Sequence, residues 1–361
     1  MKDFVKAGMT CGCILAGGVA LLFFPVMAQA KVQGQCAECH TMHNSQGGEP
    51  MAVDASGAPQ DAPNNVLLTK GCVACHTGTN TATSTMPYVF STSEPTYGDD
   101  GTTGDTLAGG NFYWVAGPAG VDNTGHNVAT DNLAEADGDL GNTPPGATTA
   151  LPSQLTCAGT TGCHGDRTVD NDFGAISGSH HADDSTIDGT TVATSYRFLN
   201  GILGLEDDDW EYQPTSTEHN QYYGVDRTAD TENDEGTISS LCAQCHNDFH
   251  NGAGNVQGTE GGFGSPWVRH PTDFDMGNTA ADSEYRNYGG GTYVVSAPVA
   301  STNVSSVVTN VTFNDDTIVT CVSCHRAHGT PNADLLRWDY NSIVAGGGGT
   351  GGCFECHTTK M

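Results

Sequence analysis

Cysteine and histidine recur together along this chain of 361 residues, at a spacing that can hold a metal-containing cofactor. Twelve of the 14 cysteines form six close pairs, and a histidine directly follows each pair. In chain order, motifs one to six are Cys36–Cys39–His40, Cys72–Cys75–His76, Cys157–Cys163–His164, Cys242–Cys245–His246, Cys321–Cys324–His325 and Cys353–Cys356–His357. All except motif three have the form CxxCH. This repetition indicates several copies of one kind of binding site.

The CxxCH spacing is typical of covalent attachment of haem c. Two thiols add to the two vinyl groups of a haem, and the next histidine reaches the iron from the same side. A single CxxC could instead be half of a zinc site, a redox dithiol or a disulfide. Five copies on one chain, with no unpaired cysteine after residue 30, favour haem over those alternatives.

Motif three has five residues between its cysteines, so its insert must bulge away from a porphyrin. Gly159 and Gly162 would permit such a bulge, because glycine adopts conformations that other residues avoid. The alternative is a Cys157–Cys163 disulfide in an oxidising compartment. Because His164 occupies the position that the motif requires, we predict a sixth haem here.

Six haems with both axial positions filled need six histidines beyond those of the motifs. Eight are present: His43, His126, His180, His181, His219, His250, His270 and His328. A six-coordinate iron suits an electron carrier, whereas a catalytic haem needs an open position for substrate. No motif has lysine in place of its histidine, which would have hinted at a catalytic site. The count therefore favours electron transfer over catalysis.

The positions of these eight histidines narrow their roles. His43, His250 and His328 follow motif histidines by three or four residues, so they cannot easily reach the far face of their own haem and are predicted to bind a neighbouring one. His126 and His270 are plausible distal ligands, and His180 and His181 compete for the last place. His219 resembles an ordinary exposed histidine, and each of the others could also be a surface residue.

The first thirty residues resemble a signal peptide. Lys2 and Lys6 precede an apolar run at 14–24, and Ala28-Gln29-Ala30 supplies a cleavage site. A membrane anchor is the alternative, but the run is short for a span of about 30 Å. Residues 31–361, predicted to form a single domain, carry 10 Lys and Arg against 41 Asp and Glu, a formal charge of −31. Such a surface repels nucleic acid and anionic lipid, and suits cationic partners, metal ions or an extracellular matrix.

The composition predicts a mostly irregular fold with short helices and few short strands. Only 37% of the chain is apolar, 48 residues are glycine, and little helical periodicity is visible. We expect short helical turns at the motifs, strands at 293–295 and 304–313, and a flexible lead at 346–352 into motif six. The core would then be a row of stacked haems rather than side chains alone.

Several segments, taken in order, resemble the filament-forming outer-surface hexahaem c-type cytochromes of bacteria that respire on extracellular metals. They are CAECHTMHNSQGG at 36–48, TGHNV at 124–128, SYRFLNG at 195–201, LCAQCHNDFHNG at 241–252, VRHP at 268–271 and CVSCHRAHG at 321–329. The resemblance implies a continuous haem stack with two histidines on every iron. It also implies that His43 binds a haem of the adjacent subunit in a head-to-tail filament, and that His126, His250, His270 and His328 are distal ligands.

The chain departs from this family at motifs two and three. The insert of motif three replaces the family's CxxCH, and Gly165-Asp166 stands where a second histidine is found in the relatives. A histidine expected shortly after motif two is missing as well, and the segment at 86–90 takes its place. His180 or His181 could substitute for it.

The leading hypothesis is thus a secreted hexahaem electron carrier that polymerises outside the cell and passes electrons to extracellular metals or other cytochromes. A monomeric periplasmic or surface shuttle is the first alternative. A multihaem reductase of a small oxyanion is the second, and a zinc-binding structural protein is the third.

Overall fold

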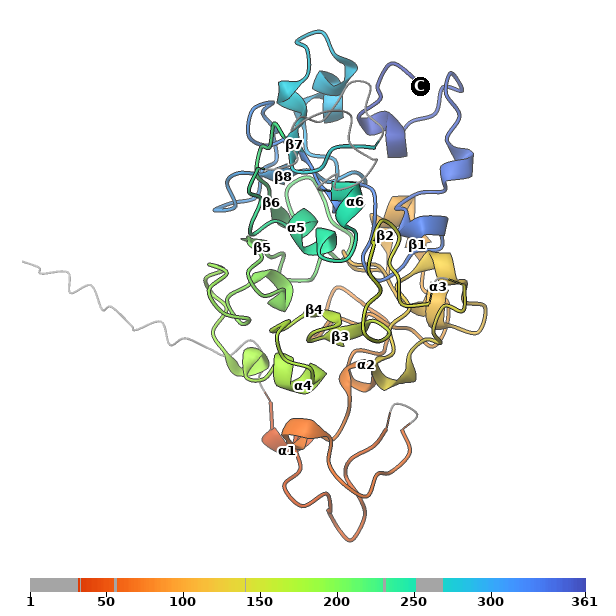
Figure 1. Cartoon of the computed structure of the whole chain (residues 1–361), viewed down its shortest axis with the longest axis vertical. Helices are drawn as coiled ribbons and strands as arrows, with labels where there is room; N and C mark the ends of the chain where they lie inside the picture. The colour runs from red at the N-terminus through yellow and green to blue at the C-terminus, as the bar shows by residue number, and fades with distance from the viewer. Residues whose placement is uncertain (1–31, 33, 55–56, 140, 230–231, 251–268) are drawn as a thin grey trace, which may run out of the picture.

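The computed structural model describes residues 32, 34–54, 57–139, 141–229, 232–250 and 269–361 (Figure 1). The predicted signal peptide lies outside these residues. The described chain forms an elongated body, with motif one at the lower end of the view and the segments around the strand at 274–275 at the upper end.

Helices are short, as the composition predicts. The α-helices are α1 (Cys36–Cys39), α2 (Cys72–Cys75), α3 (Tyr113–Ala116), α4 (Asp172–Ala175), α5 (Ile238–Ala243) and α6 (Asn247–His250). The 3-10 helices lie at Asn65–Leu67, Asp99–Gly101, Asp122–Thr124, Thr130–Asn132, Ser179–His181, Tyr196–Phe198, Met276–Asn278, Glu284–Gly291, Cys321–Ser323, Ala333–Leu335, Tyr340–Ser342 and Gly352–Glu355. The prediction of a mostly irregular fold is confirmed.

Nine short strands form three small sheets within the described ranges. They are β1 (Tyr97–Gly98), β2 (Thr103–Gly104), β3 (Thr156–Ala158), β4 (Gly162–His164), β5 (Gly204–Leu205), β6 (Gln221–Tyr223), β7 (Phe274–Asp275), β8 (Ala300–Ser301) and β9 (Ile318–Val319). The largest sheet has the order β5-β6-β8-β9-β7, in which β6 and β8 run parallel and the other neighbours antiparallel. It joins segments that are distant in sequence, since Tyr222 of β6 pairs with Ala300 of β8.

The two segments predicted as strands, 293–295 and 304–313, are not strands. They meet at an isolated bridge between Thr292 and Asn310 and through a hydrogen bond from the N–H of Tyr293 to the carbonyl of Thr309. Side chains of Asn303 and Asp316 accept hydrogen bonds from the nearby backbone N–H groups of Ser305 and Thr312. Such local bonds offer the backbone an alternative to a strand ladder.

Three small apolar clusters stand in place of one large core, and each contacts a motif cysteine. The first cluster lies on the five-stranded sheet around Ile318 and packs against Cys163. The second, around Tyr288, contacts Cys356, and the third, around Phe112, contacts Cys157. Each apolar cluster therefore helps to position a motif.

A buried arginine ties the loop at 101–108 to motif five. Arg326 is 1% exposed, and its guanidinium donates to the carbonyl groups of Gly101, Leu107 and Ala108. Within the described ranges, no helix is long and apolar enough to cross a membrane.

Candidate cofactor sites

The five CxxCH motifs share one backbone turn. In each, the motif histidine N–H donates to the carbonyl of the first cysteine, over 2.8 to 3.1 Å. This bond closes a single helical turn, which places both thiols and the imidazole around one point. The motifs with this bond are those of His40, His76, His246, His325 and His357.

Motif three is built from two paired strands and not from a helical turn. Strands β3 and β4, which carry Cys157 and Cys163, pair in parallel, and the insert loops out between them. Gly159 has φ +86°, a value that favours glycine, and a Cβ at Gly162 would lie 2.5 Å from the Ala158 backbone. Both cysteines are free thiols, as are all twelve motif cysteines.

Five motif histidines each face a second histidine from a distant segment. The pairs, with the distance between ring centres, are His40–His181 (5.9 Å), His76–His180 (6.4 Å), His164–His328 (6.3 Å), His246–His126 (6.1 Å) and His357–His270 (6.1 Å). Metal–imidazole bonds of about 2 Å and a ring radius of about 1 Å put ring centres about 6 Å apart across one metal ion. The donor pairs therefore fit an iron held between two imidazoles.

Hydrogen bonds at Nδ1 prepare several of these rings for metal binding. The Nδ1 atoms of His76, His164 and His246 lie 2.7 to 2.9 Å from the carbonyl oxygens of Pro87, Arg197 and Pro145. His126 and His325 make the same contact with Ala327 and Asp334, at 2.5 and 2.7 Å. A proton on Nδ1 leaves the Nε2 lone pair free for a metal.

Burial keeps these imidazoles neutral. It lowers the pKa of His76, His126 and His164. Burial, together with the neighbouring His164, His126 and His76, lowers the pKa of His328 to about 3. Only the neutral ring can donate a lone pair to a metal, so these rings are competent ligands at neutral pH.

One motif histidine has no such partner. The ring of His325 is exposed and contacts no other histidine ring in the described part of the chain, and the same holds for His43. His219 is 1% exposed and stacks on Tyr293, with ring centres 3.7 Å apart, so the prediction that it is exposed is wrong. His250 is also 1% exposed, and its Nε2 faces Asp234 rather than another imidazole.

Neighbouring motifs bring their cysteines together in chain order. The thiols of Cys72 and Cys157 lie close enough to shift each other's pKa, and so do those of Cys242 and Cys321. The remaining successive motifs are also close to each other. Cys39 raises the pKa of Cys75, Cys245 raises that of Cys163, and Cys353 raises that of Cys324. Cysteines of successive motifs therefore lie near one another.

Comparison with known proteins agrees with these motifs. The family model described as a doubled CXXCH motif matches residues 314–361, which hold motifs five and six. Together with the remaining CxxCH motifs, this match supports the class of multihaem c-type cytochromes.

The chain is similar to a particular member of that class. The C-type cytochrome OmcS of Geobacter sulfurreducens is 27% identical over 394 aligned residues, which cover 93% of this chain and 86% of OmcS. Two solved structures also match, titled as the outer membrane cytochrome S filament and as OmcS nanowires from the same organism. Each is 21% identical with a TM-score of 0.49, covering 88% of this chain and 86% of the other. The sequence comparisons support an OmcS-like multihaem cytochrome.

Sequence reasoning found every histidine of the five pairs but not the pairing. His180 and His181 do not compete for one place, because each faces a different motif histidine. The only sequence signal for these two separate roles was that His180 and His181 are adjacent in the chain. Sequence reasoning also missed Asp234 and Asp273, which surround His250.

Proposed function

We propose that this protein is a secreted hexahaem electron carrier that polymerises into an extracellular filament. The observation that carries the proposal is the set of five facing histidine pairs, beside a single motif histidine that lacks a partner in the described chain. The similarity to OmcS, whose solved structures are titled as a filament and as nanowires, supports it.

Each motif binds one haem c through its two cysteines and its histidine. The distal ligands are His181 for motif one, His180 for two, His328 for three, His126 for four and His270 for six. When bound, each haem supplies a one-electron ferric/ferrous couple. The paired histidines keep both axial positions filled, so no iron in these five sites offers a place for substrate. This supports an electron carrier rather than an enzyme.

The haem of motif five would be completed by His43 of an adjacent subunit. His325 is exposed and holds its Nδ1 against Asp334, so its Nε2 is free to bind metal. His43 is also exposed, and it follows α1, which lies toward the lower end of the body in Figure 1, by four residues. Repeating this head-to-tail contact would extend a filament, because a heterologous interface that does not close propagates.

The electron path would follow chain order from motif one to motif six. The proximity of cysteines in successive motifs supports this order, since it places neighbouring attachment points close together. The row supports hopping between adjacent haems along each subunit, with extracellular metals or other cytochromes as acceptors.

The monomeric shuttle is the main alternative. It would have to complete motif five from its own chain, with His43, His219 or His250. His219 is packed against Tyr293 and His250 against Asp234, so neither is placed to serve without rearrangement. A reductase would keep motif five open, with a five-coordinate iron.

Electron cryomicroscopy of the protein sheared from the cell surface tests the proposal. We expect filaments with a continuous haem row, in which His43 of one subunit binds the iron held by His325 of the next. Discrete particles with six self-contained haems would overturn the filament and leave the shuttle. A motif-five iron with one open axial position inside the particles would favour the reductase.

A further inference from the structure

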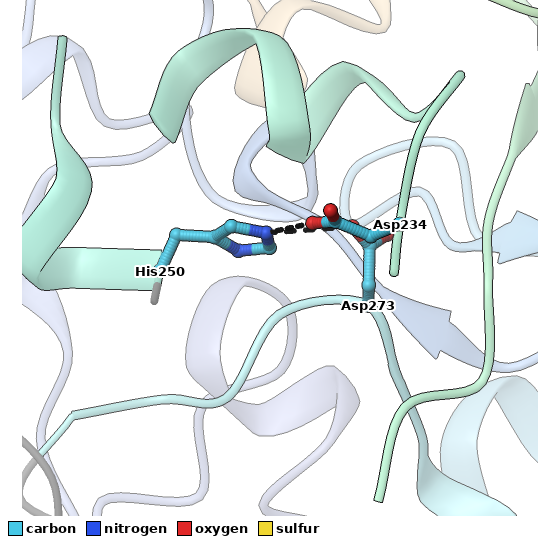
Figure 2. A group of neighbouring side chains, drawn as sticks. All are labelled: Asp234, His250 and Asp273. Carbon is cyan, nitrogen blue, oxygen red and sulfur yellow. Dashed lines mark hydrogen bonds and ion pairs between the residues drawn. The ribbon is translucent and has the colours of Figure 1, made fainter. Parts of the chain in front are cut away.

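His250 lies at the centre of a buried group that the haem sites do not use. It is the last residue of α6, and its Nε2 faces the carboxyl groups of Asp234 and Asp273 (Figure 2). The Nε2 atom lies 3.8 Å from Oδ2 of Asp273. One ligand atom from each of the three residues lies within 4.8 Å of the other two.

One carboxyl oxygen in this group of three residues has no hydrogen-bond partner. His250 is 1% exposed and Asp273 is fully buried. Oδ2 of Asp273 accepts a hydrogen bond from Thr237, but its Oδ1 is buried and has no hydrogen-bond partner. Burying a carboxylate oxygen without a partner is costly, so native structures rarely leave one unfilled. In Figure 2 the Asp273 carboxyl points toward Asp234 and the His250 ring.

The neighbouring arginine, Arg227, does not provide a hydrogen-bond partner for Oδ1 of Asp273. Arg227 is fully buried, and its Nη1 lies 3.8 Å from Oδ2 of Asp234. Its Nη2 donates to the carbonyl of Thr272 over 2.8 Å and lies 3.2 Å from Nδ1 of His250. Arg227 thus lies beside Asp234 and the Nδ1 atom of His250, whereas the Nε2 atom of His250 faces the two carboxyl groups.

The ionisation of the three residues suits a cation. Burial lowers the pKa of His250, which keeps the ring neutral. Burial opposes ionisation of Asp234, but the hydrogen bond with His250 and the charge of Arg227 lower its pKa. Burial raises the pKa of Asp273, and a cation bound in the group would offset this cost of ionising its carboxyl.

We propose that Asp234, His250 and Asp273 bind one divalent first-row transition metal ion, such as Zn²⁺ or Mn²⁺. One imidazole nitrogen and two carboxylate oxygens suit these ions. Thr272 provides the supporting contact, because its Oγ1 lies 2.5 Å from Nδ1 of His250 and can accept the Nδ1 proton. The Nε2 lone pair is then directed at the metal.

The ion would cross-link three segments around motifs four and five. Asp234 precedes α5, His250 ends α6, and Asp273 directly precedes β7. Asp273 also lies close enough to Cys242 to raise the pKa of that thiol, and Cys321 lies close enough to raise the pKa of Asp273. The proposed metal site would therefore have a structural role near two haem attachment points. It would have no part in electron transfer.

Metal content of the haem-loaded, full-length protein tests the proposal. After dialysis against a chelator and addition of Zn²⁺, we expect one tightly held zinc per chain by mass spectrometry of the metals. Asp234→Asn and His250→Gln should each lose that equivalent. Asp275→Asn is the matched control, because Asp275 is also fully buried with one unpartnered oxygen but does not belong to the group of Asp234, His250 and Asp273. It should keep the zinc.

Two readouts keep the test decisive if a variant misfolds. X-ray absorption at the zinc edge of the wild-type protein should show one imidazole nitrogen with oxygen ligands; sulfur or oxygen alone would overturn the site. Magnetic circular dichroism of His250→Gln should keep six low-spin haems. Conversion of one haem to high spin would instead make His250 a haem ligand, and absence of tight zinc in the wild type would also overturn the proposal.

Discussion

Cys36 and Cys39 of motif one are exposed, whereas Val322 and Ser323, between the cysteines of motif five, are buried. Motif one is a single turn at one end of the molecule, yet its histidine faces His181 within the same chain. Motif five follows β9 and is capped by reciprocal hydrogen bonds between Thr320 and Ser323. Its histidine is nevertheless the one without a partner ring in the described structure.

The comparison separates two tasks that a haem motif must perform. Holding the cysteines is local, and a well-packed loop such as that of motif five does it best. Completing the iron requires an imidazole from elsewhere, which packing around the motif does not provide. An exposed His325 on a rigid support is therefore suited to a ligand from a second chain, and an exposed His43 is suited to be that ligand.

The largest effect is expected from His43→Ala. If His43 completes motif five of the next subunit, its loss should abolish filaments and turn one of six haems from low spin to high spin. Negative-stain microscopy and electron paramagnetic resonance measure the two effects. Met42→Ala, at a neighbouring side chain that is 77% exposed, is the control and should leave both unchanged. Normal filaments with six low-spin haems in the His43 variant would remove the intersubunit ligand.

His181→Ala should have a smaller effect, confined to motif one. Its haem would lose the distal imidazole and become high spin, while filaments persist because His43 and His325 are intact. His180→Ala is the matched comparison, since it should affect motif two instead. Redox titration followed by magnetic circular dichroism distinguishes the two sites, because loss of an axial imidazole shifts the potential of that haem alone. If both variants altered the same haem, the assigned pairing would be wrong.

The smallest effect concerns the last residues after motif six, whose attachment depends on charge. Glu284 accepts a hydrogen bond from the N–H of Thr359 over 2.9 Å, and lies 3.2 Å from Nζ of Lys360. Partial burial disfavours its carboxylate, but the bonds from Thr359 and Lys360 outweigh this and lower its pKa from 4.5 to about 2. The stabilisation is thus complete above about pH 4.5 and is lost as the pH falls toward 2.

Hydrogen exchange at the Thr359 amide measures that loss. After correction for the intrinsic pH dependence of exchange, protection should decrease between pH 4.5 and 2. Glu284→Gln keeps an acceptor oxygen but cannot titrate, so its protection should not change over this range. Asp282→Asn, at a nearby exposed position, should behave like the wild type. A pH-dependent loss that persists in Glu284→Gln would assign it to another group.

The sequence alone determined the attachment sites. The spacing of two cysteines and a histidine is set by the covalent chemistry of one cofactor, so it can be read without a fold. The same is true of the predominance of irregular structure, which follows from abundant glycine and sparse apolar residues. Both depend on local composition and on contacts within five to eight residues.

Only the tertiary structure decided which distal histidine meets which motif. His126 faces His246 and His328 faces His164, across 120 and 164 residues of chain without helical or strand periodicity. His219 looked exposed because its neighbours are polar, but Tyr293, from a distant loop, covers it. In a fold made mostly of loops, such long-range contacts depend on many weak interactions between distant segments. They cannot be predicted from any local sequence pattern.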